Sequence, residues 1–247
     1  MGVLERELEY HEKLYSGFAQ VHFARPAVRA LREHMVKRIL RAAGAGSESR
    51  VLSLGCGIGD TELLLAGRVA TVVGVDLSPA AVRQARADAA RLGVGNARFE
   101  EGSSAEGRYD LVIAIFFLHH LSEDALAELP GKLRDVLAPG GVFYSLDPSS
   151  RRFSGAVGRI LFPRLMKKYQ TPDEHELEPD ATAMVFRNAG FETRIGMYDF
   201  ASSPLAGLLP GWRTGYRAAR SLDDVLLRLA PFRRRGSNFE LVARLRQ

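Results

Sequence analysis

The spacing of apolar residues predicts alternating strands and helices over most of the chain. Short, continuous apolar runs are typical of strands that are covered on both faces of a parallel sheet. Between them lie segments with helical periodicity, and Ser78-Pro79 and Ser122 are favourable helix starts. We expect strands at 51–54, 72–76, 97–101, 109–115, 142–147, 191–200 and 239–245.

This alternation predicts an α/β fold, with a seven-stranded, mostly parallel sheet and helices on both of its faces. Residues 1–46 are expected to form an N-terminal helical cap, and 47–247 the main domain. Two insertions exceed the minimal fold, at about 149–180 and at 202–237. The second lies between the last two predicted strands.

A glycine-rich turn, GCGIG at 55–59, follows the first predicted strand. Its three glycines carry no Cβ, so the backbone can approach a ligand closely. The next predicted strand ends on Asp76, where a carboxylate can accept both hydroxyls of a ribose. Asp60 stands where a dinucleotide motif has its third glycine, and its charge would repel a pyrophosphate. The pattern therefore predicts a site for a nucleoside.

The turn resembles motif I of the class I S-adenosylmethionine-dependent methyltransferases, which have a Rossmann-like fold. Four further blocks resemble this family in the same order: VDLS at 75–78, YDLVIA at 109–114, FLHHL at 117–121 and LAPGGVF at 137–143. The resemblance implies S-adenosyl-L-methionine as methyl donor and S-adenosyl-L-homocysteine as product. It also implies that the N-terminal helices and both insertions cover the donor and shape the acceptor pocket.

The resemblance places the donor around the glycine turn. The backbone at Gly55 and Gly57 would approach the methionine part, and Asp76 would hold the ribose. Leu77 would pack on one face of the adenine. We expect the donor to contact Gly55, Cys56, Gly57, Asp60, Asp76, Leu77, Ser103, Ser104, Ile115 and Tyr10.

Two serines depart from the family pattern. Ser53 stands where many relatives carry an acid in motif I. Ser103 follows the third strand, where relatives often have an acid that binds the adenine amino group. A hydroxyl binds more weakly than a carboxylate there, because charge-assisted hydrogen bonds are the stronger kind. A module that binds the donor without catalysis is therefore an alternative to an enzyme.

The candidates for catalysis are His119, His120 and Tyr15. Methyl transfer from a sulfonium is an in-line displacement, which needs alignment and desolvation but no metal. A general base helps only where the acceptor loses a proton. Both histidines follow the fourth strand, at the rim where open α/β sheets bind ligands, although either can be structural. Asp147 ends the fifth strand at that rim, where it binds the acceptor or caps a turn. Tyr10 and Tyr15 either close over the donor or pack within an amphipathic helix.

The composition is that of a soluble globular protein, with 46% hydrophobic and 26% charged residues. The single cysteine, Cys56, excludes an internal disulfide and a cysteine-based zinc cluster, and suits a reducing cytoplasm. The sequence shows neither a signal peptide nor an apolar stretch that could span a bilayer. A cytoplasmic protein is the resulting expectation.

The segment 202–237 gives the best indication of the acceptor. Its apolar residues recur at helical spacing and have arginines beside them. A basic amphipathic helix of this kind either lies on an anionic membrane or packs its stripe on the sheet. The stripe consists of Trp212, Tyr216, Ala219, Leu222, Leu226 and Leu229, and the flanking arginines are Arg213, Arg217, Arg220 and Arg228, with Arg233, Arg234 and Arg235 beyond.

These observations predict a methyltransferase for a small or lipid-like acceptor, similar to enzymes of quinone and natural-product biosynthesis. A nucleic-acid or protein methyltransferase is the alternative. Nucleic acid is the weaker reading because no base-reading module is recognisable. The family's NPPY-type motif for amino methylation is also absent, since 147–149 read DPS.

Overall fold

The computed structural model describes residues 24–152, 176–230 and 232–245. A seven-stranded sheet crosses the molecule in the order β3-β2-β1-β4-β5-β7-β6. Neighbouring strands are parallel, except that β7 is antiparallel to β5 and to β6. The strands are β1 (Arg50–Leu54), β2 (Thr71–Asp76), β3 (Ala97–Glu101), β4 (Tyr109–Ile115), β5 (Leu137–Pro148), β6 (Phe191–Asp199) and β7 (Asn238–Leu245). The predicted α/β fold and its seven strands are confirmed.

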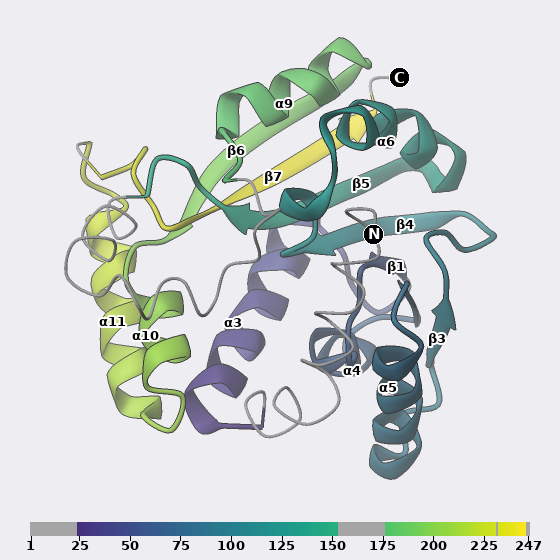
Figure 1. Cartoon of the computed structure of the whole chain (residues 1–247), viewed down its shortest axis with the longest axis horizontal. Helices are drawn as coiled ribbons and strands as arrows, with labels where there is room; N and C mark the ends of the chain where they lie inside the picture. The colour runs from purple at the N-terminus through teal and green to yellow at the C-terminus, as the bar shows by residue number, and fades with distance from the viewer. Residues whose placement is uncertain (1–23, 153–175, 231, 246–247) are drawn as a thin grey trace, which may run out of the picture.

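Helices cover both faces of this sheet (Figure 1). The first face carries α3, α4 and α5, and α10 and α11 pack against α3. The opposite face carries α6 and α9. The helices are α3 (Pro26–Ala43), α4 (Asp60–Ala66), α5 (Pro79–Leu92), α6 (Glu123–Val136), α9 (Pro179–Asn188), α10 (Ser202–Leu208) and α11 (Arg213–Leu226), with a short 3₁₀ turn, η2 (Leu118–His120), after β4.

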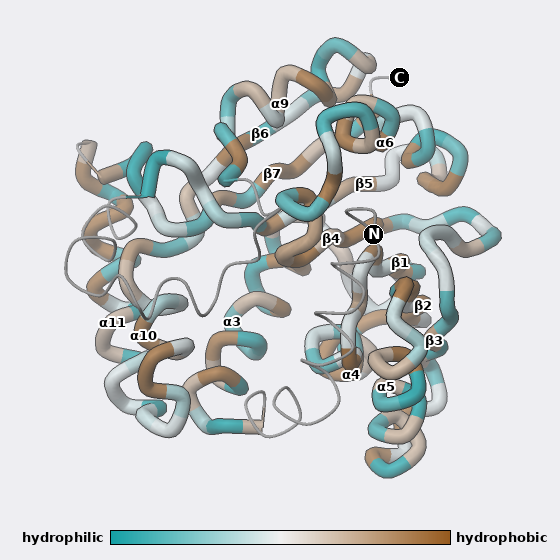
Figure 2. The backbone as a smooth tube through the Cα atoms, viewed as in Figure 1, coloured by the Kyte–Doolittle hydropathy of each residue, from teal (hydrophilic) through white to brown (hydrophobic). Residues whose placement is uncertain are grey.

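Alternate residues of the central strands enter two different cores. Val51 and Ile113 belong to the core beneath α3 and α4, whereas Leu52 and Val112 belong to the core beneath α6 and α9. Because both faces are covered, these strands read as continuous apolar runs. The outer helices, such as α5, instead mix hydrophilic and apolar positions (Figure 2).

A partly buried ion pair holds α3 against the sheet. Arg38 donates from Nε and Nη2 to the two carboxylate oxygens of Glu240 on β7, at 2.9 and 2.7 Å. The hydroxyl of Tyr144 on β5 donates to the same carboxylate at 3.1 Å. This arrangement holds α3 across the β5–β7 pair.

The insertion between β6 and β7 folds into α10 and α11, which a second set of buried polar groups holds together. Asp223 accepts hydrogen bonds from the backbone N–H groups of Ala201 and Ser202, both at 2.9 Å, where α10 begins. Arg220 donates to the Tyr198 carbonyl at 2.8 Å. The backbone N–H of Ala27, in α3, donates to the Pro210 carbonyl at 2.8 Å. The two helices are thus tied to β6 and to α3.

The predicted stripe on α11 was wrong in part. Tyr216 is buried in the core below α3, whereas Trp212, Leu222 and Leu229 are about half exposed. Arg220, which was expected beside the stripe, lies buried on the packed side. The helix therefore packs along Tyr216, Arg220 and Asp223, and Ala219 and Leu226 lie half-buried at the margin of this packed side.

Only part of the predicted caps falls within the described residues. α3 accounts for the end of the N-terminal cap, while Tyr10 and Tyr15 lie outside the described residues. Most of the first insertion does so as well. The division into a cap at 1–46 and a domain at 47–247 stays a prediction. No helix in the described ranges is long and apolar enough to cross a membrane.

Candidate functional site

The glycine turn joins β1 to α4 at the carboxyl edge of the sheet, next to the point where the strand order reverses. Open α/β sheets bind ligands in this crevice. Gly55, Gly57 and Gly59 have φ angles of 67°, 54° and 76°, in the left-handed region that favours glycine. A Cβ at Gly55 would lie 2.4 Å from the ring of Phe117, and one at Gly59 would lie 2.7 Å from Phe99. Conformation and space both require glycine at these two positions.

Asp76 lies at the end of β2, directly beside this turn. Its Oδ2 accepts a hydrogen bond from the backbone N–H of Gly57 at 2.7 Å, and its Oδ1 accepts one from Ser78 at 2.9 Å. A carboxylate has about four acceptor sites, so these two bonds fix its direction and leave acceptor capacity for a ligand. The next residue, Leu77, exposes about half of its side chain. The structure thus brings Gly57, Asp76 and Leu77 together as expected for a nucleoside site.

A buried acid below the turn was missed by sequence analysis. Glu62, in the first turn of α4, is 2% exposed, and Ser53 on β1 donates to its Oε1 at 2.6 Å. Burial raises the pKa of Glu62 to about 7. Its Oε2 has no hydrogen-bond partner among the described residues. The helix therefore supplies a carboxyl group next to Ser53, the position where the strand lacks one. Glu62 lies three positions after Gly59, and only this spacing in the sequence could have indicated the acid.

Asp60 and Cys56 have partners of their own within the protein. Asp60 forms an ion pair with Nε of Arg32 on α3, at 2.7 Å. Cys56 is buried, its backbone N–H donates to the Val75 carbonyl at 3.0 Å, and its side chain lies beneath Gly74. Burial raises the pKa of the Cys56 thiol well above its ordinary value. Both side chains therefore support the shape of the turn, and their contact with a donor stays a prediction.

Phe116, directly after β4, has a φ of 55°, a left-handed conformation that is unfavourable for a bulky side chain. It is the one described residue other than glycine with a positive φ. Its backbone N–H donates to the Leu146 carbonyl at 2.7 Å, which holds the bend against β5. The bend separates Ile115, the last residue of β4, from Phe117. It places the ring of Phe117 against Gly55. Such strained residues cluster at binding and active sites.

His119 and Asp147 form a buried pair at the ends of β4 and β5. His119 Nδ1 lies 3.0 Å from Asp147 Oδ1, and the backbone N–H of His119 donates to the same oxygen at 3.3 Å. The two residues are 7% and 0% exposed. The carboxylate accepts, so Nδ1 carries the hydrogen and Nε2 remains as an acceptor. The ring of His120 stands 4.0 Å from that of His119, centroid to centroid.

The structure gives Asp147 a contact that the sequence did not indicate, since its carboxylate lies against His119. Binding of the acceptor by Asp147 stays a prediction. A carboxylate behind the imidazole is the arrangement that prepares a histidine as a general base.

Ser103 and Ser104, which were expected to contact the donor, lie exposed on the segment between β3 and β4. Within the described ranges, no group of three or more His, Cys, Asp and Glu side chains is placed to hold a metal ion.

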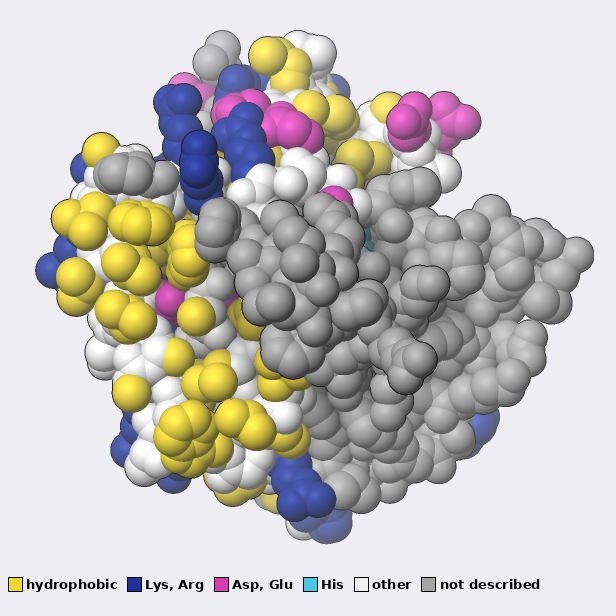
Figure 3. All heavy atoms as spheres, turned by 60° about the vertical axis from the view of Figure 1, so that its left-hand side comes forward, with side chains coloured by type: hydrophobic (Ala, Val, Ile, Leu, Met, Phe, Trp, Pro, Cys, Tyr) yellow, Lys and Arg dark blue, Asp and Glu magenta, His cyan; other side chains and the backbone are white. Residues whose placement is uncertain are grey.

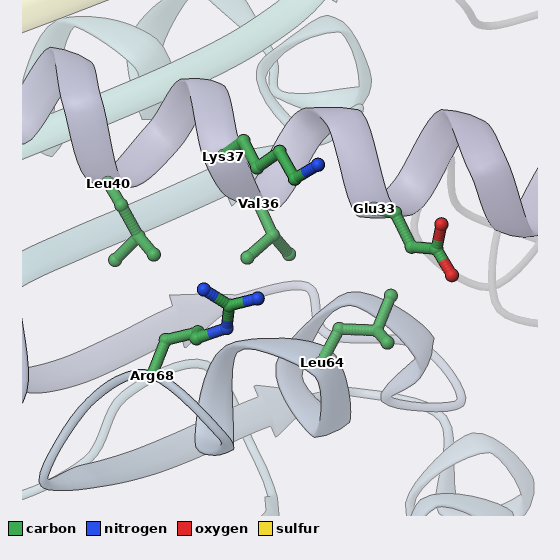
Figure 4. Close-up of a pocket in the computed structure, with 6 residues that line it drawn as sticks. All are labelled: Glu33, Val36, Lys37, Leu40, Leu64 and Arg68. Atoms are coloured by element: carbon green, nitrogen blue, oxygen red, sulfur yellow. The ribbon is translucent and has the colours of Figure 1, made fainter.

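A separate cleft of about 290 Å³ lies between α3 and α4 (Figure 4). Three apolar side chains and three charged ones line it, and no residue of the glycine turn is among them. The cleft is therefore distinct from the candidate site. Its lining consists of Glu33, Val36, Lys37, Leu40, Leu64 and Arg68.

Residues 51–141 match the family model described as a methyltransferase domain. This range contains the glycine turn, Asp76 and His119. Over this range the chain is therefore similar to a methyltransferase domain. The resemblance seen in the sequence motifs is thereby confirmed.

Similar proteins differ in what their names say they methylate. The 23S rRNA (uracil(1939)-C(5))-methyltransferase RlmD of Salmonella choleraesuis is 32% identical over 172 residues, which are 69% of this chain and 34% of that protein. The ubiquinone biosynthesis O-methyltransferase of Acinetobacter baylyi is 29% identical over 163 residues, 62% of this chain and 67% of that protein. The chain thus spans about a third of the length of the Salmonella rRNA methyltransferases that it matches.

Solved structures show the same fold. The complex of DhpI with SAH has a TM-score of 0.62 and 15% identity, and the match covers 99% of this chain and 97% of that one. Magnesium protoporphyrin IX methyltransferase (ChlM) from Synechocystis PCC 6803, with bound SAH, has a TM-score of 0.60 and 19% identity, covering 89% and 84%. These structures therefore share the fold of this chain.

Proposed function

We propose that this protein is an S-adenosyl-L-methionine-dependent methyltransferase that acts on a small or lipid-like acceptor and releases S-adenosyl-L-homocysteine. The observation that carries the proposal is the contact between the Asp76 carboxylate and the Gly57 N–H, at 2.7 Å. It holds an acceptor for ribose hydroxyls beside the glycine turn, at the edge of the sheet where open α/β folds bind ligands. The solved neighbours that contain SAH support the same donor.

In the proposed donor site each group has a separate task. Asp76 accepts the ribose hydroxyls, and the half-exposed Leu77 covers an adenine face. Gly55 and Gly57 allow the methionine part to lie against the backbone. Ser103 follows the end of β3, which pairs with β2, and Ile115 ends β4, which pairs with β1; both would contribute to the rim of the site.

The donor supplies a methyl group on a positively charged sulfur, which leaves as a neutral thioether. The protein has to align the acceptor with that methyl group and exclude water. Where the acceptor carries a proton, Nε2 of His119 takes it as the new bond forms, while Asp147 stabilises the resulting imidazolium. His120 and Tyr15 remain further candidates for contact with the acceptor.

A small or lipid-like acceptor is favoured over RNA by the extent of the matches. The alignment with the ubiquinone biosynthesis enzyme covers two thirds of that protein, whereas the alignment with the rRNA enzymes covers a third of theirs. A cytoplasmic location belongs to the same proposal. Its support is the single cysteine, Cys56, which lies buried as a free thiol.

Calorimetric titration with S-adenosyl-L-homocysteine tests the donor site. Asp76→Ala removes charge-assisted bonds worth about 1.5–3 kcal/mol each, so affinity should fall at least tenfold. Asp135→Ala, which removes an exposed carboxylate from α6, is the matched control and should bind normally. Equal affinity in Asp76→Ala and the wild type would refute the site. Transfer of label from the donor to a lipid extract rather than to RNA tests the acceptor class.

A further inference from the structure

The surface formed by α10, α11 and the residues after α11 is unusually apolar. Six of the ten exposed large hydrophobic side chains in the described ranges lie within residues 208–229, on α10, on α11 and on the residues that follow each of them. Figure 3 shows apolar side chains gathered over this side of the molecule. We call this the α10–α11 surface, and it consists of Leu208, Leu209, Trp212, Leu222, Val225 and Leu229, each 48–56% exposed.

The outward face of α11 is apolar although the helix already buries another face. Tyr216, Arg220 and Asp223 make the packed side. Leu222 and Val225, three residues apart, point away from it and are 53% and 56% exposed. A helix at the surface of a globular protein normally has polar residues there. Exposed apolar clusters of this kind mark interaction sites.

The charged residues around the α10–α11 surface are predominantly basic. Arginines at 213, 217, 228 and 233–235 are all exposed. The acids of α11 are engaged, because Asp223 is buried and Asp224 accepts from Arg220 at 2.9 Å. Lys and Arg side chains are visible at the margins of the apolar patch in Figure 3. An apolar centre with a basic border complements a partner that has an apolar interior beneath an anionic outer layer.

We propose that the α10–α11 surface binds membranes that contain anionic lipid. The leucines and Trp212 enter the boundary between headgroups and acyl chains, and the arginines contact the headgroups. A second copy of the chain fits less well, because a two-fold contact would bring the same arginines together. Nucleic acid fits the arginines but leaves the exposed leucines unexplained.

The α10–α11 surface adjoins the edge of the sheet that carries the candidate site. β6 runs parallel to β5, so α10 begins at the same edge of the sheet as Asp76 and Asp147. The buried bonds from Asp223 to Ala201 and Ser202 fix the surface to the sheet. If the proposed methyl transfer holds, a lipid-like acceptor reaches the site without leaving the membrane. The binding itself does not depend on that activity.

Vesicle flotation of the full chain tests the proposal. The protein should float with vesicles of phosphatidylcholine and phosphatidylglycerol at low salt, and less with phosphatidylcholine alone. The double variant Leu222→Asn/Val225→Asn should lose at least tenfold in partitioning. Replacing Arg233, Arg234 and Arg235 by Gln should cost about 100-fold at low salt, since each basic group adds about 1 kcal/mol, and should weaken the dependence on salt, which the three remaining arginines still cause.

Leu92→Asn, at a 54% exposed leucine on α5, is the matched control and should float like the wild type. Melting temperatures of all variants, measured in parallel, show that the fold is retained. The proposal is overturned if the wild type stays in solution with every vesicle. It is equally overturned if Leu222→Asn/Val225→Asn abolishes a dimer seen by light scattering while flotation is unchanged. Binding of the protein to RNA but to no vesicle would overturn it as well.

Discussion

The buried pair of Ser53 and Glu62 should make the stability of this protein depend on pH in a direction opposite to that of most carboxyl groups. The pKa of Glu62 is about 7 in the folded protein, against an ordinary value of 4.5. Between these values the folded chain holds a proton that the unfolded chain has lost. The free energy of unfolding therefore falls as pH rises from about 4.5 to 7.

The size of this effect follows from the two pKa values. Each pKa unit corresponds to 1.36 kcal/mol, so ionising Glu62 costs about 3 kcal/mol when complete. In Glu62→Gln the side chain cannot ionise, and its amide oxygen can still accept from Ser53. The variant should therefore match the wild type near pH 5 and exceed its free energy of unfolding by up to about 3 kcal/mol at pH 8.

Urea denaturation from pH 5 to 8.5, followed by circular dichroism, gives the difference between variant and wild type at each pH. Taking the difference between variant and wild type is necessary because His34 also makes the free energy of unfolding depend on pH, with the opposite sign. Burial lowers the pKa of His34 to about 4, so its contribution to stability is lost as pH falls from 6.5 towards 4. Glu128→Gln, at an exposed site on α6, is the control and should give a flat difference. A flat difference for Glu62→Gln as well would refute the reasoning.

Three further predictions concern the turn, the histidine pair and the insertion. Gly55→Ala should abolish donor binding in calorimetry, because its Cβ would meet Phe117 at 2.4 Å, whereas Gly46→Ala, with open space, should bind normally. His119→Ala should lower turnover by about 10² with donor affinity unchanged; a parallel loss of melting temperature would mark a structural role instead. Asp223→Ala leaves two buried N–H groups unpaired and should lower the free energy of unfolding in urea by about 2–4 kcal/mol; a loss below 1 kcal/mol would contradict the assigned bonds.

The strands and the glycine turn could be predicted because their signals are local. Continuous apolar runs arise wherever both faces of a strand are covered, and a left-handed turn without space for a Cβ requires glycine. The position of Asp76 follows from the length of the βαβ unit. These features depend on residues that are neighbours in the sequence.

The contacts that complete the site could not be predicted, because they join residues from different elements. Glu62 reaches Ser53 from a helix, and Asp147 reaches His119 from the neighbouring strand. On α11, periodicity placed Tyr216 and Leu222 in one stripe, whereas the structure buries the first and exposes the second. A buried arginine, Arg220, decides that, since its guanidinium binds the Tyr198 carbonyl.

The position of β7 between β5 and β6 has a consequence for how this chain folds during synthesis. The ribosome completes β5 and β6 before it makes β7, so the strand must enter a gap between two elements that already exist. The Arg38–Glu240 pair adds a contact between residues 202 positions apart. Contacts of such separation form slowly. Until β7 arrives, β5 presents an unpaired edge that can join another chain, so nascent chains halted before residue 238 should require a chaperone to stay monomeric.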